Sequence, residues 1–322
     1  MSQQSKSLII EIIKLFDPLR SVKRKIRKMN NRVALLENDV ALCLPENKYP
    51  DYLKRWFYKT TGEYLNLERP LTYNEKIQYL KLYEKSPLKT QMADKYEVRS
   101  YIEEKIGKGY LIPLIGVYDS FDDIDFDTLP NQFALKCNHG SGYNIICKDK
   151  AQFDKQAARK QVNEWMSTNY AFLYGLELQY ADVKPKIVIE EFISNRNGED
   201  LIDYKFWCFG GKAHFVQCSS RNQKRVEMIF YDREWNRQDF YYVNQIPYDF
   251  PKPDNLDEMI ELAERLSKGF PHIRVDLYRM DDGHIYFGEF TFTSRSGICP
   301  WKPAYANRMM GDLIKLERND GI

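Results

Sequence analysis

The 322-residue sequence lacks the features that would place it in or across a membrane. No apolar run approaches the roughly 18 residues that a transmembrane helix needs, and the N-terminus has neither the basic start nor the cleavage site of a signal peptide. Neither sign of charge is in excess, because 48 Lys and Arg face 46 Asp and Glu. We therefore expect a cytoplasmic protein with no nucleic-acid partner.

Common metal and nucleotide motifs are also missing. The six cysteines form no CxxC pair and have no histidine spacing suited to zinc, so they are expected to be reduced core residues. The absence of GxxxxGK[ST] excludes a P-loop. A DxD triplet at a strand end is absent too, which disfavours a sugar-nucleotide glycosyltransferase.

Residues 1–45 are expected to form helices that precede the main domain. Residues 5–16 have the composition of a short apolar helix. Over 19–43, apolar residues recur at alternating steps of three and four, the heptad pattern of a coiled coil, with a basic cluster between them. Three interpretations stay open: a homodimer through 19–43, peripheral contact with the inner face of the plasma membrane, or packing on the chain's own domain.

Residues 46–130 are expected to form the helical N-terminal part of the main domain. Thr72 and Glu75 make a capping box at the start of one helix. A single helix is expected over 90–106, and Gly107 ends it.

Residues 131–322 change to a strand-rich pattern, in which short segments of β-branched and aromatic residues alternate with turns. Residues 150–180 are expected to be helical, and further helices are expected over 254–268 and near the C-terminus. Together with the preceding helices, these segments predict an α+β fold. The expected strands cover 133–137, 143–148, 186–193, 202–209, 213–218 and 226–232, followed by a hairpin that turns at Asp282-Gly283.

The glycine-rich tip NHGSG, at 138–142, is the first candidate for chemistry. A loop of small residues lets backbone N–H groups approach phosphate oxygens, and Lys136 on the preceding strand can add a positive charge. A tight hairpin turn explains the glycines equally well.

A strand that ends in two carboxylates, Glu190 and Glu191, is the second candidate. The backbone that follows can read an adenine edge, and one carboxylate can bind ribose hydroxyls. The alternative is a solvated strand end with ordinary surface glutamates.

Asp276 and Glu289 are the third candidate, because each lies inside an apolar strand, where a carboxylate is costly to bury unless it is paired or binds a metal. Side chains alternate along a strand, so Asp276 is expected to share a face with Arg274. By the same rule, Glu289 shares a face with Phe287 and Thr291. Magnesium takes carboxylates together with substrate phosphates, but an ion pair between Arg274 and Glu289 explains the pattern as well.

Taken in order, these parts resemble an ATP-grasp enzyme. Five stretches are similar to the TupA-like ATP-grasp family. They are the segment that begins with DKYEVRSYIEEKIGKGY and continues to FALKCNHGSGYNIICK, then VIEEFI, DYKFWCFGGKAHFVQ, RVDLY and GEFTFTSRSG. This family is named for teichuronopeptide synthesis and is found in bacterial capsule and cell-surface polysaccharide loci. The resemblance covers approximately 50–310 and excludes the N-terminal heptads.

The resemblance implies an ATP-grasp fold, in which two α+β subdomains enclose ATP, and it implies roles for individual residues. Many ATP-grasp ligases carry Asn two residues after the metal-binding Glu, whereas this chain has Thr291, so either one metal or two is expected. The resemblance assigns nucleotide contacts to Lys136, Gly140, Ser141, Gly142, Glu190, Glu191, Ile193 and Lys205, magnesium ligation to Asp276, Glu289 and Thr291, and stabilisation of the transferring phosphoryl group to Arg274.

The implied activity is ATP-dependent carboxylate–amine ligation through an acyl phosphate. The resemblance suggests that the carboxylate belongs to a uronic acid of a surface polysaccharide or lipid-linked glycan, and that the amine belongs to an amino acid. Arg295 and Arg221 are candidates for holding the substrate carboxylate, because arginine offers a bidentate fork; surface salt bridges are the alternative. Two other functions stay open: a phosphotransferase acting on a sugar hydroxyl, and a non-catalytic scaffold of glycan biosynthesis.

Overall fold

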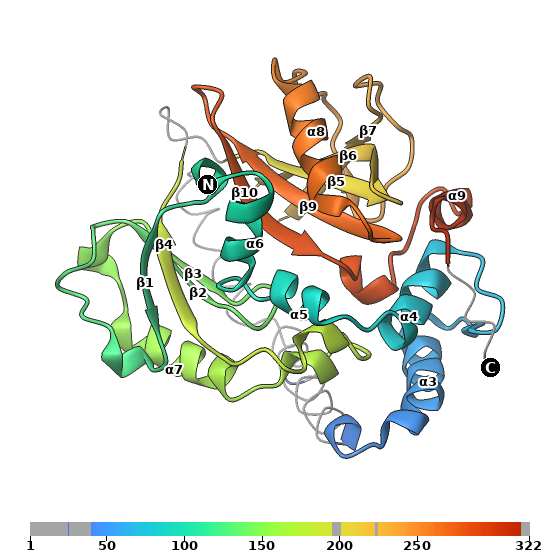
Figure 1. Ribbon diagram of the computed structural model, residues 1–322, viewed down its shortest axis with the longest axis horizontal. Helices are drawn as coiled ribbons and strands as arrows, with labels where there is room; N and C mark the ends of the chain where they lie inside the picture. Colours follow the sequence, from blue (N-terminus) through green and yellow to red (C-terminus); the bar gives the residue numbers. More distant parts are fainter. Residues whose placement is uncertain (1–24, 26–39, 195–200, 223–224, 317–322) are drawn as a thin grey trace, which may run out of the picture. The chain divides into compact units, whose positions relative to one another are not determined.

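The chain divides into two compact units, Met1–Lys48 and Tyr49–Ile322. The elements described below belong to the second unit, and Figure 1 labels its main helices and strands. The predicted helix over 5–16 and most of the heptad segment 19–43 lie outside the described residues. The computed structural model describes residues 25, 40–194, 201–222 and 225–316.

Four α-helices begin the second unit: α3 (Tyr49–Thr61), α4 (Tyr73–Tyr83), α5 (Pro87–Ala93) and α6 (Val98–Lys105). The capping box of Thr72 and Glu75 is present at the start of α4, as predicted. The single helix predicted over 90–106 is wrong. The Asp94 carboxylate accepts hydrogen bonds from two backbone N–H groups of the turn that follows α5, and such local bonds compete with helix continuation.

A four-stranded antiparallel sheet contains β1 (Leu114–Tyr118), β2 (Phe133–Cys137), β3 (Asn144–Cys147) and β4 (Ile187–Glu191) in the order β1-β4-β2-β3. Strands β2 and β3 form the predicted hairpin. Helix α7 (Lys155–Met166) packs Ala158 and Val162 into the core of this sheet. The segment 150–180 was predicted as helical, but its α-helical part is α7, followed by short 3₁₀ turns such as η5 (Tyr170–Phe172) and η6 (Leu178–Tyr180).

The second sheet has six strands in the order β10-β9-β5-β6-β7-β8. Helix α8 (Leu256–Ser267) covers one face of it (Figure 1), where Met259 and Leu266 share a core with Ile273 and Val275. Helix α9 (Tyr305–Leu313) follows the sheet near the C-terminus. The strands are β5 (Asp203–Phe209), β6 (Lys212–Asn222), β7 (Arg225–Tyr231), β8 (Asn244–Gln245), β9 (His272–Arg279) and β10 (Ile285–Thr291).

A β-bulge at Gly288 corrects the predicted arrangement of β10. Phe287 pairs with Leu277 and Glu289 pairs with Asp276, so the register shifts between Phe287 and Glu289. Phe287 therefore packs in the apolar core with Leu277, whereas Glu289 joins Asp276 on the opposite face. The prediction that Phe287 and Glu289 share a face is wrong, because one extra residue reverses the alternation of side chains.

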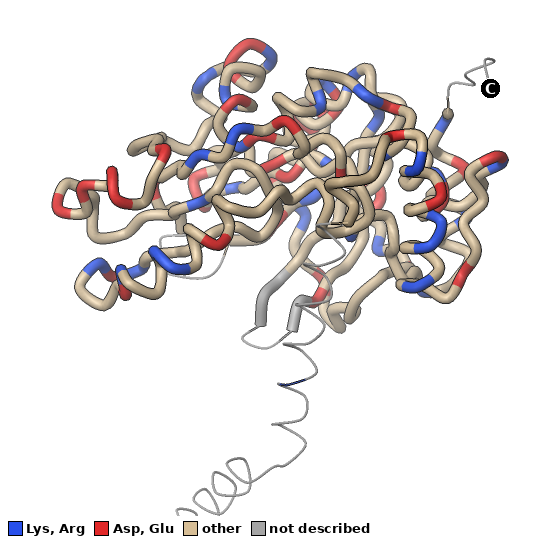
Figure 2. Tube along the Cα trace, turned by 90° about the horizontal axis from the view of Figure 1, so that it is seen from below, with Lys and Arg blue, Asp and Glu red and all other residues tan. Residues whose placement is uncertain are grey.

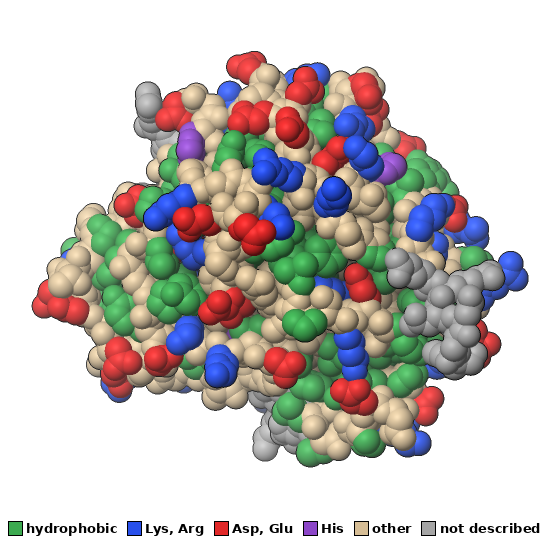
Figure 3. All heavy atoms as spheres, in the orientation of Figure 1, with side chains coloured by type: hydrophobic (Ala, Val, Ile, Leu, Met, Phe, Trp, Pro, Cys, Tyr) green, Lys and Arg blue, Asp and Glu red, His purple; other side chains and the backbone are tan. Residues whose placement is uncertain are grey.

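The burial of the cysteines and the distribution of charged residues largely agree with what the sequence predicts. Five of the six cysteines are buried and free, and Cys43 is the exposed exception. Acidic and basic residues are interspersed along the described chain (Figure 2), and their side chains are interspersed on the face seen in Figure 3. None of the helices in the described residues is both long and apolar enough to span a bilayer.

Candidate active site

A cleft of about 210 Å³ brings together residues from the two sheets and from α6. Strand β10 contributes Glu289, and the segment after β4 contributes Ile193. Other residues predicted to contact the nucleotide line the same cleft, namely Lys136, Gly142, Glu190 and Glu191.

Glu190 is held between two cations. Its Oε2 lies 2.6 Å from Lys136 Nζ, and its Oε1 lies 2.9 Å from Arg99 Nη1. Glu190 is buried, whereas the next residue, Glu191, is exposed, because neighbouring side chains of a strand point to opposite faces. Glu190 is therefore not an ordinary surface glutamate, and Glu191 is the carboxylate left accessible.

The glycine-rich tip is anchored at its base. Asn138 is fully buried, and its Nδ2 donates to Asp94 Oδ2 at 2.9 Å. Gly140 lies against Tyr170, where an added Cβ would come within 2.6 Å of the ring. Gly142 is exposed and has a φ of 75°, a left-handed conformation that favours glycine. The first residues of the tip are therefore held in place by buried contacts, whereas its last residue, Gly142, is exposed.

Lys95 and Arg99 are cleft residues that sequence reasoning missed. Lys95 lies in the turn between α5 and α6, and its Nζ donates to the carbonyl of Gly140. Burial lowers the pKa of Lys95, and Glu289 opposes this shift. Both cations belong to the quoted stretch DKYEVR, but in a segment expected to be one continuous helix they were indistinguishable from a solvated face.

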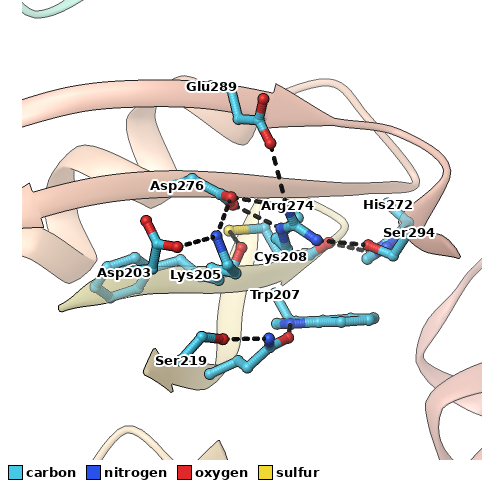
Figure 4. A network of polar contacts seen from close by, with 12 residues as sticks. Asp203, Lys205, Trp207, Cys208, Ser219, His272, Arg274, Asp276, Glu289 and Ser294 are labelled. Atoms are coloured by element: carbon cyan, nitrogen blue, oxygen red, sulfur yellow. Dashed lines mark hydrogen bonds and ion pairs between the residues drawn. The ribbon is translucent and has the colours of Figure 1, made fainter. Parts of the chain in front are cut away.

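Asp276 is the most heavily paired carboxylate on the polar face of the second sheet (Figure 4). Its Oδ1 lies 2.6 Å from Arg274 Nε, and its Oδ2 lies 2.7 Å from Arg274 Nη2 and 2.8 Å from Lys205 Nζ. Burial alone would raise the pKa of Asp276, but Arg274 and Lys205 outweigh burial and lower it. Asp276 is therefore ionised and fixed in place.

Glu289 is the accessible partner of Asp276. The two residues are directly opposite each other on β10 and β9, yet the Glu289 side chain is 39% exposed against 4% for Asp276. Its Oε1 lies 3.5 Å from Arg274 Nη2. Thr291 is on the same face, opposite Arg274. Arg274 therefore contacts both carboxylates, and its pairing with Asp276 is the tighter one.

Asp276 and Glu289 are a pair of neighbouring carboxylates on one face of the second sheet. Two neighbouring carboxylates are the protein donors that magnesium takes when water and substrate phosphates complete its octahedral shell. Across the described ranges, no group of three or more His, Cys, Asp or Glu side chains could hold a metal. The donor set therefore suits a cation that arrives with a phosphate ligand.

The structure describes the side chain of only one of the two candidate substrate arginines. Arg295 is exposed, on the turn η7 (Ser294–Gly297) that follows β10. Arg221 is on β6, and its side chain is outside the described structure. Among the described residues, Lys205 does not line the cleft; its Nζ lies 2.8 Å from Asp276 Oδ2 and 3.3 Å from Asp203 Oδ2.

Comparison with known proteins gives a family match and distant structural similarities. Residues 75–315 match the family described as TupA-like ATPgrasp. No curated protein sequence matches the chain significantly.

Similar solved structures include N5-carboxyaminoimidazole synthetase from Staphylococcus aureus complexed with ADP (13% identity, TM-score 0.44, covering 77% of this chain and 60% of that one). Another is L-amino acid ligase from Bacillus licheniformis (14% identity, TM-score 0.44, covering 76% and 56%). A third is D-alanine–D-alanine ligase from Bacillus anthracis (18% identity, TM-score 0.40, covering 69% and 67%). This chain thus spans little more than half the length of the first two proteins.

Proposed function

Since the chain belongs to the TupA-like ATP-grasp family, as the sequence predicted, we propose that it is an ATP-dependent carboxylate–amine ligase. One observation carries this proposal. Three cations, Lys95, Arg99 and Lys136, line the same cleft as Glu289, whose strand partner is Asp276. A polyphosphate bound to a divalent cation needs both groups, the first to neutralise phosphate charge and the second to hold the metal.

In this proposal each side chain has a separate task. Lys136, Lys95 and Arg99 bind phosphate oxygens, so Lys136 and Arg99 exchange their present partner Glu190 for the nucleotide. Asp276 and Glu289 hold Mg²⁺, which when bound neutralises phosphate charge and polarises the phosphoryl group. The flexible tip of Ser141 and Gly142 covers the phosphates, and the segment at Glu191 and Ile193 binds adenine and ribose.

The proposed reaction has two steps. A substrate carboxylate oxygen attacks the γ-phosphorus of ATP, ADP leaves, and an acyl phosphate forms, while the Arg274 guanidinium stabilises the charge that develops on the transferring group. An amine nitrogen then attacks the acyl carbon, inorganic phosphate leaves, and the nitrogen loses a proton to give an amide. Arg274 suits this role because Asp276 and Ser294 hold its guanidinium in place.

The proposed substrates are a uronic acid of a bacterial surface polysaccharide or lipid-linked glycan and an amino acid or other amine. Arg295 and Arg221 are proposed to bind the substrate carboxylate, and Lys205 is proposed as a further phosphate contact. Thr291 is proposed as a weak additional magnesium ligand. A homodimer or membrane contact through 19–43 belongs to the same proposal.

The test measures ADP release from ATP and Mg²⁺ with D-glucuronate or D-galacturonate, with and without a mixture of amino acids, and identifies the product by mass. An amide product that forms only when both substrates are present supports the ligase. A phosphorylated sugar as the final product contradicts the ligase and supports the phosphotransferase. Failure to bind ATP supports the scaffold.

A further inference from the structure

A turn with unusual backbone conformation follows β10 and lies beside Arg274. This turn is η7, Ser294–Gly297. Arg295 and Ser296 have φ values of 47° and 55°, and Gly297 has 70°, so three consecutive residues are in the left-handed region. Residues with a Cβ rarely adopt it, because the Cβ crowds the backbone carbonyl. Such strain persists only where surrounding contacts impose it.

Helix α4 supplies contacts that impose this conformation. Lys81 Nζ donates to the carbonyl of Ser296 at 2.7 Å. Gln78 Nε2 donates to the carbonyls of Ser296 and Gly297 at 3.0 and 2.8 Å. Gly297 is also required for space, because an added Cβ would meet Gln78 and would lie 2.7 Å from Ile77. The carbonyls of the turn are therefore bound to the helix.

Glu177 holds the residue that enters the turn. The Thr293 hydroxyl donates to the Glu177 carboxylate, and Gln179 Nε2 donates to Thr293 Oγ1 at 3.1 Å. Glu177, Thr293 and Lys81 are all buried. Lys81 Nζ also donates to the carbonyl of Gly175 at 2.8 Å, so it bridges the turn and the segment that carries Glu177. We call Lys81, Gln78, Glu177 and Thr293 the turn clamp.

The clamp reaches the candidate active site through Ser294. Arg274 Nη1 donates to Ser294 Oγ at 3.3 Å, while the same guanidinium binds Asp276 (Figure 4). Arg295, one residue later, is exposed and forms no ion pair within the described part of the chain. Lys81 is not among the described residues that line the nucleotide cleft. Among the described residues, the clamp therefore contacts the turn that carries Ser294 and does not line the nucleotide cleft.

We propose that Lys81, Gln78 and Glu177 are positioning residues for acceptor binding. They hold the turn so that Ser294 orients Arg274 and the exposed cation of Arg295 is presented to the acceptor carboxylate. This inference rests on the proposed ligase function. It separates the two substrates, because loosening the turn weakens acceptor binding and leaves nucleotide binding unchanged.

The main test is Gln78→Met, which keeps the length of the side chain and removes both hydrogen bonds to the turn. Gln161→Met, at an exposed position of α7, is the matched control. We expect the KM for D-glucuronate to rise about tenfold in Gln78→Met, the scale of one or two lost hydrogen bonds. The Kd for MgADP, measured by titration calorimetry, stays as in the wild type, and the control changes neither constant.

A second variant removes charge without leaving an unpaired ion. Replacing Lys81 alone would strand the buried Glu177 and risk misfolding, so Lys81→Met is combined with Glu177→Gln. We expect the same rise in the KM for D-glucuronate, with MgADP binding retained. The conservative variant Lys81→Arg keeps the positive charge, so its KM for D-glucuronate should lie between those of the wild type and the double variant.

Three results overturn the inference. If the KM for D-glucuronate stays at the wild-type value in Gln78→Met and in the double variant, the clamp does not position the acceptor site. If the Kd for MgADP rises by the same factor as that KM, the clamp supports the whole fold and not the acceptor side. If the wild type forms no amide with any uronic acid and amino acid, the ligase proposal itself fails, which is a different outcome from an active wild type with unaffected variants.

Discussion

In the four-stranded sheet, Glu190 lies between Lys136 and Arg99, whose side chains are 21% and 17% exposed. In the six-stranded sheet, Asp276 lies between two cations in the same way, but Arg274 is 10% exposed and binds it through two nitrogens. The same charge pattern therefore occurs twice, once at an open cleft wall and once in a buried face.

The difference in burial suggests a difference in task. Water and an incoming anion can compete for Lys136 and Arg99, so Glu190 can act as a stand-in for phosphate in the free protein. Around Asp276 the partners are fixed by two-nitrogen geometry, which favours a group that stays in place while a ligand binds next to it at Glu289. The first cluster is suited to exchange, and the second to preorganisation.

The largest expected effect concerns stability. Asp276→Asn leaves Arg274 and Lys205 buried with one neutral partner, and breaking a buried pair in this way costs about 3–5 kcal/mol of unfolding free energy. Glu190→Gln should cost about 1 kcal/mol, because Lys136 and Arg99 can turn toward water. Urea denaturation of these two isosteric variants checks the comparison, and equal losses would contradict it.

The next effect concerns activity. Glu289→Gln should lower the rate of ADP release by about a hundredfold, the scale expected when a preorganised charge at a reacting phosphate is removed. Because Glu289 is 39% exposed, the unfolding free energy should change little. Glu104→Gln, on the exposed surface of α6, is the control. Unchanged ADP release in Glu289→Gln would refute the assigned metal site.

The buried side chain of His272 should make the stability of the protein sensitive to acid. His272 on β9 is buried; its Nδ1–H must donate to the carbonyl of Cys208, at 2.9 Å, so Nε2 accepts from the Tyr73 hydroxyl, at 3.1 Å. Burial lowers the pKa of His272 to about 3. In the unfolded chain the pKa of His272 is about 6.5. Between pH 6.5 and pH 3, roughly, the unfolded state therefore binds more protons than the folded state, and the free energy of unfolding falls as pH falls through this window.

The size of this pH effect is measurable. At pH 5 the expected loss is about 2 kcal/mol relative to pH 8 for this single group. Urea denaturation of the wild type and of His272→Gln at both pH values tests it. His272→Gln should be less stable than the wild type at pH 8, but its free energy of unfolding should fall by about 2 kcal/mol less between pH 8 and pH 5. An identical pH dependence in the two proteins would exclude His272 as the source.

The smallest expected effect concerns Thr291, on the face of Glu289 and opposite Arg274. A carboxamide oxygen is a better magnesium ligand than a hydroxyl. We therefore expect Thr291→Asn to lower the Mg²⁺ concentration needed for half-maximal ADP release by about threefold. The matched variant Thr291→Val should raise it slightly. If both variants match the wild type, Thr291 lies outside the metal shell.

Much of the fold follows from local pattern. The strand segments, the β2–β3 hairpin and the capping box of Thr72 and Glu75 were predictable, because alternation, turn residues and caps act over a few neighbouring residues. The break in the helix at Asp94 was not predictable. It depends on hydrogen bonds from two backbone N–H groups to the Asp94 carboxylate, which the sequence alone does not show. Lys95 was missed for the same reason.

By itself, the sequence determined the family and the order of the motifs that carry Lys136, Glu190, Asp276 and Glu289. Only the tertiary structure decided how these acids and bases meet. Strand alternation alone puts Glu289 on the same face as Phe287, and the bulge at Gly288 separates the two. The physical reason is that register and long-range pairing depend on the neighbouring strand, which spacing along one strand does not describe.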